Sequence, residues 1–470
     1  MELTNKQIVL ISFILVICAI LIGENAFWGG IGLLLILLTY IYGERFILAL
    51  VIISLFTLVG DVGQSLRTFV QIIDFSLLGY LFLKRFGLRF YSYPRIPRFL
   101  VYFLLLYYFS MIASSVMSDY PISGLGLIAR QTVFFVIVYL FYALINDEKD
   151  IRNYFLALTI ASFILASSSI LSFAIEGSFF TEGIRSRFTG LIGNPDVVSA
   201  FYMISIPLIL SFLFRYKKKS IITINILLLL FFSLALFLTI SRSAFLGVYT
   251  STVIMFYILK RRYFKWLIIS TVVLVLAVVL FEPLNEIITL SFRIESGLAK
   301  RDYLWATSVD IIKDYPVFGI GPGAYKYIFF NYFPVMLNSG IGTILKELYS
   351  LTDGSNLSHN YFLFLFSELG ISGLVVALAL PIIYFRVGLK TIKKYKNSSQ
   401  EIYYFIVALF AGGASMFVRS TVDSIGLLFY GRVSSDLPFW ILFGSLIYFY
   451  NNSNGLSNAQ KSEVKINNTY

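Results

Sequence analysis

Long apolar segments alternate with short polar segments along almost the whole chain. An α-helix needs about 20 apolar residues to cross a bilayer, and fewer where flanking side chains reach the interface. By this measure the pattern predicts about fourteen membrane-spanning helices. The predicted spans are residues 7–23, 27–43, 46–60, 68–84, 99–117, 122–145, 153–175, 197–214, 221–239, 243–259, 265–282, 361–385, 402–420 and 437–450. We therefore expect an all-α, polytopic integral membrane helical bundle with about 12–14 transmembrane helices.

The first apolar segment, from Ile8 to Ile22 after Lys6, resembles the apolar part of a secretory signal peptide. No small-residue cleavage site follows it, and further apolar segments come at once. We interpret it as a retained first span.

Composition agrees with this fold class, because 58% hydrophobic and only 13% charged residues exceed what a soluble core needs. The single cysteine, Cys18, excludes an internal disulfide and a cysteine-based metal site. A net charge of +12 would suggest nucleic acid as the partner of a soluble protein. Here the basic residues lie in short loops between apolar segments, so we expect a lipid bilayer as partner and no nucleic acid.

The basic residues form four clusters between predicted spans. They are Lys84/Arg85/Arg89/Arg95/Arg98, Arg215/Lys217/Lys218/Lys219, Lys260/Arg261/Arg262/Lys265 and Arg386/Lys390/Lys393/Lys394/Lys396. Four, two and two predicted spans separate consecutive clusters, so all four clusters can face the cytoplasm, as the positive-inside bias expects. Both termini are then cytoplasmic. The exterior loops are 118–121, 176–196, 240–242, 283–360 and 421–436.

The largest exterior loop, 283–360, is expected to contain short helices. Apolar residues at Leu304, Val309 and Ile312 predict an amphipathic helix that follows Arg301 and is stopped at Pro316. Aromatic residues between Tyr325 and Thr352 are predicted to pack this loop on the bundle, or alternatively to form a lid that faces sugar or lipid.

His359, the only histidine, lies at the end of this loop, where the chain returns to apolar sequence. Histidine is the side chain whose ordinary pKa lies nearest neutral pH, so His359 is a candidate general base. The alternative is a hydrogen-bonded surface residue. An exterior position separates it from nucleotide pools, which argues against a nucleotide-sugar donor.

Two arginines are predicted on the same face. Arg242 lies between two spans with almost no loop, where an arginine is either functional or an interfacial anchor. Arg242 and Arg301 can hold a lipid diphosphate, since guanidinium groups bind phosphate oxygens in pairs. His359 can then accept the proton of an acceptor hydroxyl that attacks the anomeric carbon of the donor sugar. The predicted reaction is an inverting glycosyl transfer without ATP or another cofactor.

Further candidates are weaker. Arg185 and Arg187 can assist with substrate or can be solvated, and the solvated interpretation is favoured. Gly319, Gly321 and Gly323 alternate after Val317, which allows tight turns and the close backbone approach of a ligand-binding loop, or marks an ordinary loop.

The chain resembles the O-antigen ligase and polymerase family in five short pieces that come in the family's order. These pieces are Phe188–Pro195, Ser241-Arg242 with Gly247, Arg301 with Trp305, Pro316–Gly321, and His359-Asn360 followed by Glu368-Leu369-Gly370 and Gly373. The resemblance covers about residues 185–385. It implies a membrane glycosyltransferase, similar in fold to helical enzymes with lipid-linked donors, that works without a metal ion.

The resemblance also implies the partners and the site. The donor is a polyprenyl-diphosphate-linked glycan, and the acceptor is a glycan or a lipid-linked glycan on the outer face of the plasma (inner) membrane. Arg242, Arg301 and His359 correspond to the family's functional residues. Arg185, Arg187, Asn360, Gly321 and Gly323 are the predicted substrate-binding residues.

Four parts follow from this interpretation. They are N-terminal transmembrane helices at 1–182, a ligase-like catalytic region at 183–385 that includes the extracytoplasmic loop, C-terminal transmembrane helices at 386–450, and a polar cytoplasmic tail at 451–470. The oligomeric state is not predicted.

Several alternatives stay open. Ligase and polymerase need the same three residues, and the short polar tail argues against, without excluding, a protein O-oligosaccharyltransferase. A lipid-linked oligosaccharide flippase or exporter would need charges along a pathway through the bilayer, whereas Asp61, Asp74, Asp119 and Glu176 lie mostly at span ends. A non-catalytic assembly factor would leave the arginines and histidine unexplained. A cell-wall polymerase would use Asp353 instead.

Overall fold

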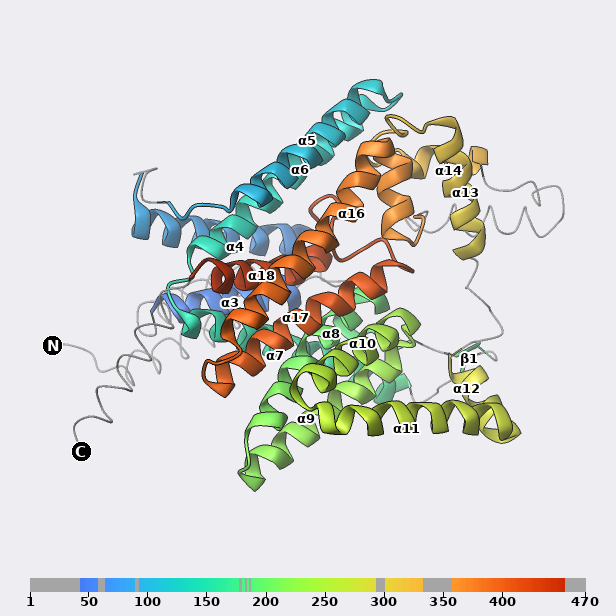
Figure 1. Ribbon diagram of the computed structural model, residues 1–470. Coiled ribbons are helices and arrows are strands. Elements are labelled where there is room, and N and C mark those ends of the chain that lie inside the picture. Colours follow the sequence, from blue (N-terminus) through green and yellow to red (C-terminus); the bar gives the residue numbers. More distant parts are fainter. Residues whose placement is uncertain are drawn as a thin grey trace, which may run out of the picture. The chain divides into compact units, whose positions relative to one another are not determined.

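The protein is described by a computed structural model. It describes residues 43–57, 64–88, 93–176, 180–181, 184–185, 187–292, 301–332 and 357–452. Helices dominate these residues (Figure 1), and the only strands among them are two short antiparallel ones, β1 (Phe180–Thr181) and β2 (Ile184–Arg185). The fold is therefore all-helical, as predicted.

Helix bounds follow the predicted spans closely. The long helices are α3 (Glu44–Thr57), α4 (Gln64–Phe86), α5 (Arg98–Met117), α6 (Pro121–Ala143), α7 (Glu148–Glu176), α8 (Pro195–Arg215), α9 (Lys219–Thr239), α10 (Arg242–Leu259), α11 (Arg261–Leu280), α16 (Tyr361–Tyr395), α17 (Gln400–Ser420) and α18 (Val433–Asn451). The helices from α5 to α11 and from α16 to α18 make ten that are long and apolar enough to cross a membrane, among the residues described. The predicted spans 7–23 and 27–43 lie outside the described residues, apart from residue 43.

Shorter helices fill the largest predicted exterior loop. They are α12 (Glu282–Phe292), α13 (Arg301–Asp314) and α14 (Tyr325–Tyr332), and a single 3-10 turn, η2 (Gly190–Ile192), precedes α8. The predicted amphipathic helix is confirmed as α13, and its buried face was predicted in part. Leu304 is buried as predicted, but Val309 is 40% exposed, Ile312 is only partly buried, and Ile311 is buried instead.

Contacts divide the chain into two compact units. Unit 1 contains Met1–Tyr93 and Ala143–Ala161, and unit 2 contains Pro94–Tyr142 and Ser162–Tyr470. Within unit 1, Glu44 at the start of α3 pairs with Arg85 at 2.9 Å, and Arg45 pairs with Asp150 at 2.6 Å. Ser54 donates a hydrogen bond to Asp74.

In unit 2, α8, α17 and α18 are the most buried of the candidate spans. The start of α8 is well defined because Asn194 accepts hydrogen bonds from the backbone N–H of Asp196 and Val197, and Pro195 occupies the first helical position. By contrast, α11 buries none of its side chains within the described structure, which suits a helix surrounded by lipid.

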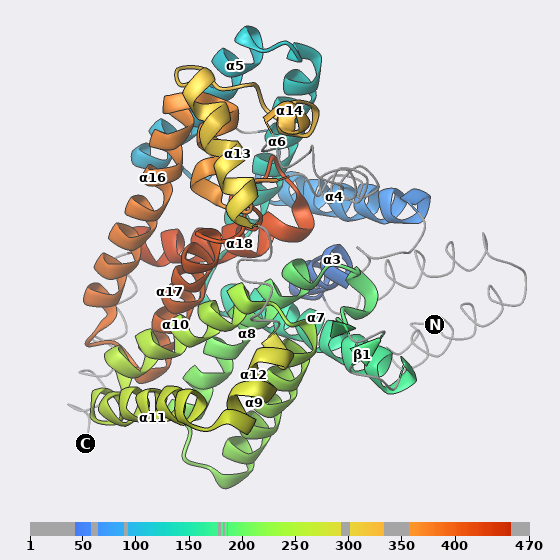
Figure 2. The ribbon, with the colours of Figure 1, turned by 90° about the vertical axis from the view of Figure 1, so that its right-hand side faces the viewer.

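The predicted single span 361–385 is interrupted. The helix α16 runs on to Tyr395 and is broken at Gly370, where φ is 66°. The segment before α14 fills the break, since Ile320 N–H donates to Ser367 O at 3.0 Å, Gly321 N–H to Glu368 O at 2.9 Å, and Ile371 N–H to Pro316 O at 2.9 Å. Backbone groups inside a membrane protein need such partners, which explains why a helix break is tolerated here. Both views show α13 beside the first part of α16 (Figures 1 and 2).

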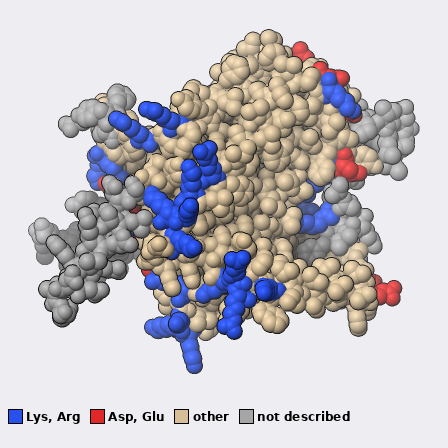
Figure 3. All heavy atoms as spheres, in the orientation of Figure 1, with Lys and Arg blue, Asp and Glu red and all other residues tan. Residues whose placement is uncertain are grey.

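The basic clusters of unit 2 lie at one end of its helices. Arg215 pairs with Glu401 at 2.6 Å, and Lys260 lies 5.7 Å from the Tyr404 ring centroid. Lys394 donates to Tyr450 O at 3.0 Å. Figure 3 shows Lys and Arg gathered where α9 and α11 begin and where α16 ends. These contacts connect loops that were all predicted to face the cytoplasm.

Candidate active site

His359 lies at the opposite ends of these helices, just before α16. Its φ of 46° is a left-handed conformation that non-glycine residues seldom adopt, so its backbone must be held by neighbours. Trp305 Nε1 on α13 donates to His359 O at 3.4 Å. Asn360 donates its backbone N–H to Ser424 Oγ at 3.0 Å. The imidazole is thus presented from a constrained position, with its side chain 28% exposed.

A buried ion pair stands behind the imidazole. His359 Nδ1 lies 3.8 Å from Asp423 Oδ1, which is an ion-pair distance and longer than a hydrogen bond. Arg419 Nη2 donates to Asp423 Oδ2 at 2.7 Å, and both side chains are 2% exposed. Burial alone would raise the pKa of the Asp423 carboxyl, but Arg419 and His359 outweigh it and hold that pKa well below its usual range. Asp423 is therefore a permanent anion facing the Nδ1 edge of the ring.

The loop that carries Asp423 is stabilised by a second buried carboxylate. The buried Asp436 carboxylate, in the first turn of α18, accepts hydrogen bonds from Gly426 N–H at 3.1 Å and Phe429 N–H at 2.6 Å. Asp436 was predicted to belong to the exterior loop 421–436, whereas the helix begins at Val433. The earlier helix start lets the carboxylate organise the loop.

Arg301 is placed next to this site by α13. It is the first residue of that helix and precedes Trp305 by one turn, so the two share a face. Trp305 in turn contacts the His359 backbone. Arg301 is half-buried.

Arg242 is the first residue of α10, after the tight turn that the sequence predicted. Ile240 reverses the chain with φ 53°, and Ser241 Oγ donates to Asp196 Oδ1 at 2.7 Å. Because α10 packs antiparallel to α17, with Lys260 near Tyr404, the start of α10 reaches the end of α17 where Arg419 lies. The three predicted catalytic residues therefore lie at the same end of unit 2.

The glycine-rich segment approaches backbone closely, as expected, but its neighbours are the protein itself. Gly319, Gly321 and Gly323 all have positive φ, and a Cβ at Gly319 would collide with the backbone of Glu368. The buried Glu368 carboxylate accepts hydrogen bonds from Gly323 N–H, Tyr325 N–H and the hydroxyl of Tyr430. These glycines shape the packing of the loop, and their predicted contact with substrate stays a prediction.

The aromatic segment is confirmed as packing over its described part. Tyr325 and Phe329 are buried in a core with Leu304 and Ile311. Tyr327 stacks on Tyr120 with ring centroids 4.6 Å apart. The rest of the segment, with Asp353, lies outside the described residues.

The remaining predicted binding residues, Asn360, Arg187 and Arg185, lie in different structural environments. The Asn360 side chain caps α16 by accepting from Phe362 N–H and Leu363 N–H, and its amide donates to Thr421 O at 2.9 Å. Arg187 is exposed, and its role in binding substrate stays a prediction. The next residue, Phe188, donates its backbone N–H to Leu238 O at 3.1 Å. The backbone of Arg185 lies in β2, paired with Phe180.

Sequence reasoning missed Asp423 and Arg419. A charged pair spaced i, i+4 at the end of an apolar span is costly unless it is used, and that spacing was the available signal.

The ten candidate spans and the two chemically distinct ends of unit 2 define a multi-span helical membrane protein. Residues 226–378 match the family model described as O-antigen ligase, a range that includes Arg242, Arg301 and His359. The match covers 153 of the 470 residues, and over that part it supports the resemblance to the O-antigen ligase family. No curated protein matched the chain.

Proposed function

We propose that the protein transfers a polyprenyl-diphosphate-linked oligo- or polysaccharide to an acceptor hydroxyl on the extracytoplasmic face of the plasma membrane. The observation that carries the proposal is the setting of His359. Its imidazole is partly exposed, its backbone is left-handed, the buried Asp423 anion faces its ring, and Arg301 lies on the neighbouring helix. The family match covers this histidine and both arginines.

His359 acts as the general base in this proposal. Asp423 faces Nδ1 and favours a proton there, which leaves Nε2 to accept the proton of the acceptor hydroxyl. The acceptor oxygen forms a bond to the anomeric carbon as the bond from that carbon to the diphosphate breaks. The polyprenyl diphosphate leaves with the electron pair, and attack from the opposite side inverts the anomeric configuration.

Arg242 and Arg301 bind the diphosphate and stabilise the charge that develops on it. Both are the first residues of helices, where unpaired backbone N–H groups and the helix dipole also favour anions. Two guanidinium groups together with two helix starts suit a ligand that carries two phosphates. The bond energy of the donor drives the reaction, with no ATP and no metal ion in the proposed step.

The extracytoplasmic location is supported by the opposed ends of unit 2. Basic residues gather at one end, and cytoplasmic loops of membrane proteins are enriched in Lys and Arg. His359 lies at the other end.

The test is to incubate the purified protein with a lipid-diphosphate glycan and to identify what the glycan becomes attached to. Release of polyprenyl diphosphate with longer glycans means a polymerase, and glycan on a new lipid means a ligase. Glycan on protein means a protein O-oligosaccharyltransferase. Movement of the donor between leaflets without turnover would contradict the proposal and indicate a flippase.

A further inference from the structure

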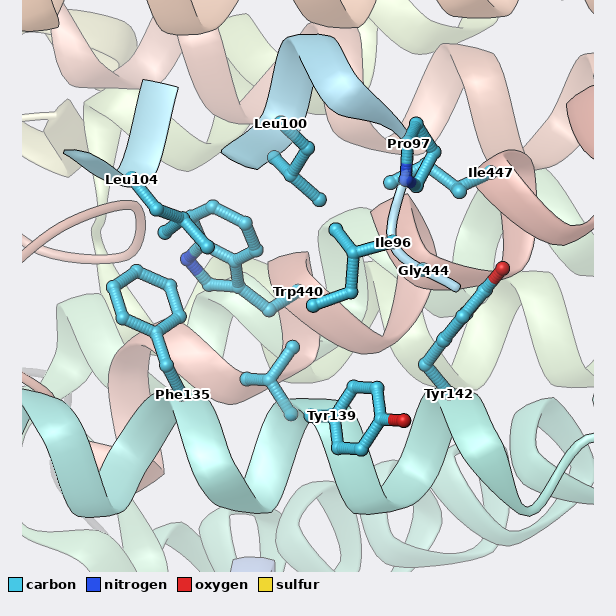
Figure 4. Close-up of a pocket in the computed structure, with 11 residues that line it drawn as sticks. Ile96, Pro97, Leu100, Leu104, Phe135, Tyr139, Tyr142, Trp440, Gly444 and Ile447 are labelled. Atoms are coloured by element: carbon cyan, nitrogen blue, oxygen red, sulfur yellow. The ribbon is translucent and has the colours of Figure 1, made fainter. Parts of the chain in front are cut away.

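An apolar groove lies between α5, α6 and α18 of unit 2 (Figure 4). Its cavity volume is about 50 Å³, and the groove is partly open to the outside. The polar tips of its aromatic residues are engaged elsewhere, because Tyr139 Oη donates to Pro94 O at 3.0 Å and Trp440 Nε1 donates to Leu427 O at 2.7 Å. Tyr142 Oη accepts from Asn451 Nδ2 at 3.2 Å. The walls thus offer mainly hydrocarbon surface.

The groove runs parallel to the helices. On α18 it is lined by Trp440, Gly444 and Ile447, which share one face and extend over about 10 Å of helix. Its floor is open because Gly444 has no side chain. A Cβ there would meet only Tyr142 Cβ at 3.9 Å, an ordinary contact. An apolar groove of this extent along the direction of the spans fits a part of an extended hydrocarbon chain, whose remainder continues along the outer surface of the helices.

The mouth of the groove is cationic. Ile96 and Pro97 line it, and the residues on either side of this pair, Arg95 and Arg98, are exposed. Lys394 is close to the same end of α18, since it donates to Phe449 O and Tyr450 O at 3.0 Å. Guanidinium groups beside an apolar groove complement a molecule with a phosphate head and a hydrocarbon tail.

We propose that this groove binds one acyl chain of an anionic phospholipid, with the phosphate headgroup at Arg95 and Arg98. The site lies at the basic end of unit 2, at the opposite end of α18 from the loop that carries Asp423. It is therefore separate from the proposed diphosphate site and does not depend on the proposed function. The bound lipid fills the space between three helices and holds the 93–98 segment against them.

Trp440 is a natural reporter of this site because it lines the groove. The full chain with Trp28→Phe, Trp266→Phe and Trp305→Phe keeps Trp440 as its single tryptophan. In phosphatidylcholine vesicles, phosphatidylglycerol with brominated chains should quench Trp440 at lower mole fraction than brominated phosphatidylcholine does. The expected preference is about fivefold for each arginine. Equal quenching by the two lipids would overturn the proposal.

Two variants test the headgroup site and the groove separately. Arg95→Gln with Arg98→Gln should remove the preference for phosphatidylglycerol, and Gly444→Leu should suppress quenching by either lipid because its side chain fills the groove. The matched control is a second background with Trp28→Phe, Trp305→Phe and Trp440→Phe, which keeps only Trp266, 67% exposed on α11. Quenching of Trp266 should be unchanged when either variant is made in that background. An equal change at Trp266 would indicate a general surface-charge effect and would overturn the proposal. Relief of quenching by a polyprenyl phosphate at lower concentration than by unlabelled phosphatidylglycerol would also overturn it.

Discussion

At the scale of single residues, His359 is defined by its surroundings more than by being the only histidine. Its backbone is held by Trp305 and Ser424, and its ring faces Asp423. The sequence led to His359 because a lone titratable residue at the end of a loop is easily noticed. Asp423 comes far later in the chain, and only the folding of α16 against α17 brings it behind the ring.

Asp423→Asn should slow transfer. The pKa of Asp423 is well below its usual range, so the carboxylate is charged throughout any practical assay. The amide removes the anion that faces Nδ1 of His359. The maximal rate should fall by about tenfold across the practical pH range because the ring is less well oriented.

The matched control is Asp310→Asn. Asp310 pairs with Lys313 on the exposed side of α13, and its side chain is 48% exposed. That variant should leave the maximal rate unchanged. A parental maximal rate in Asp423→Asn would remove Asp423 from the mechanism.

Arg301→Lys and Arg242→Lys should each weaken the use of the donor by about tenfold in kcat/KM, although the charge is kept. Lysine cannot hold two phosphate oxygens in the planar arrangement of a guanidinium group. Steady-state kinetics with a lipid-diphosphate glycan measure the effect. Arg262→Lys, an exposed position near the start of α11, is the control that should behave as the parent protein. Parent-like kinetics in both site variants would mean that neither arginine holds the diphosphate.

At the scale of elements, the break in α16 connects the helix that follows His359 with the segment after α13, the helix that carries Arg301. The segment from Pro316 to Tyr325 binds the free backbone groups of the break, and this fixes α13 and α14 relative to α16. The sequence predicted α13 and its stop at Pro316 from local signals. It did not predict the break, because residues 361–385 are apolar enough to form one continuous helix. Gly370 also looks like an ordinary helical glycine in the sequence, and only its contact with the segment from Pro316 to Tyr325 sets it apart.

Gly370→Ala should destabilise the protein by about 2 kcal/mol or more, because the residue has φ 66° and a Cβ would collide with the Val317 backbone. Thermal unfolding in detergent measures this loss. Gly126→Ala is the matched control, since a Cβ at Gly126 meets nothing within 4 Å. That helical position should gain up to about 1 kcal/mol. Similar unfolding temperatures for both variants would show that the close approach at Gly370 is not required.

At the scale of the whole molecule, the pattern of charges separates two ends of unit 2. The four basic clusters were assigned to one side from the even number of spans between them, and contacts such as Arg215 with Glu401 agree for the clusters of this unit. Length and hydropathy predicted the ten long apolar helices among the described residues. Of the other four predicted spans, 7–23 and 27–43 lie outside the described residues apart from residue 43, and 46–60 and 68–84 form α3 and α4, which are not among the ten. The contacts between helices could not be predicted, because lipid-facing and protein-facing residues are equally apolar in a membrane protein.

The orientation predicts which positions an impermeant thiol reagent can reach on intact cells. In a Cys18→Ala background, Lys326→Cys should be labelled from outside, and Lys396→Cys only after the membrane is opened. Both lysines are exposed on the protein, so access depends on the membrane. The reverse pattern would place His359 in the cytoplasm and contradict the extracytoplasmic site.

The most direct measurement compares the parent protein with His359→Ala, using a purified lipid-diphosphate glycan and an acceptor. The parent should release polyprenyl diphosphate and extend or relocate the glycan. His359→Ala should insert and bind the donor normally, with transfer reduced by about 10²- to 10⁴-fold, the usual contribution of a general base. Transfer at the parental rate by a correctly inserted His359→Ala variant would contradict the account.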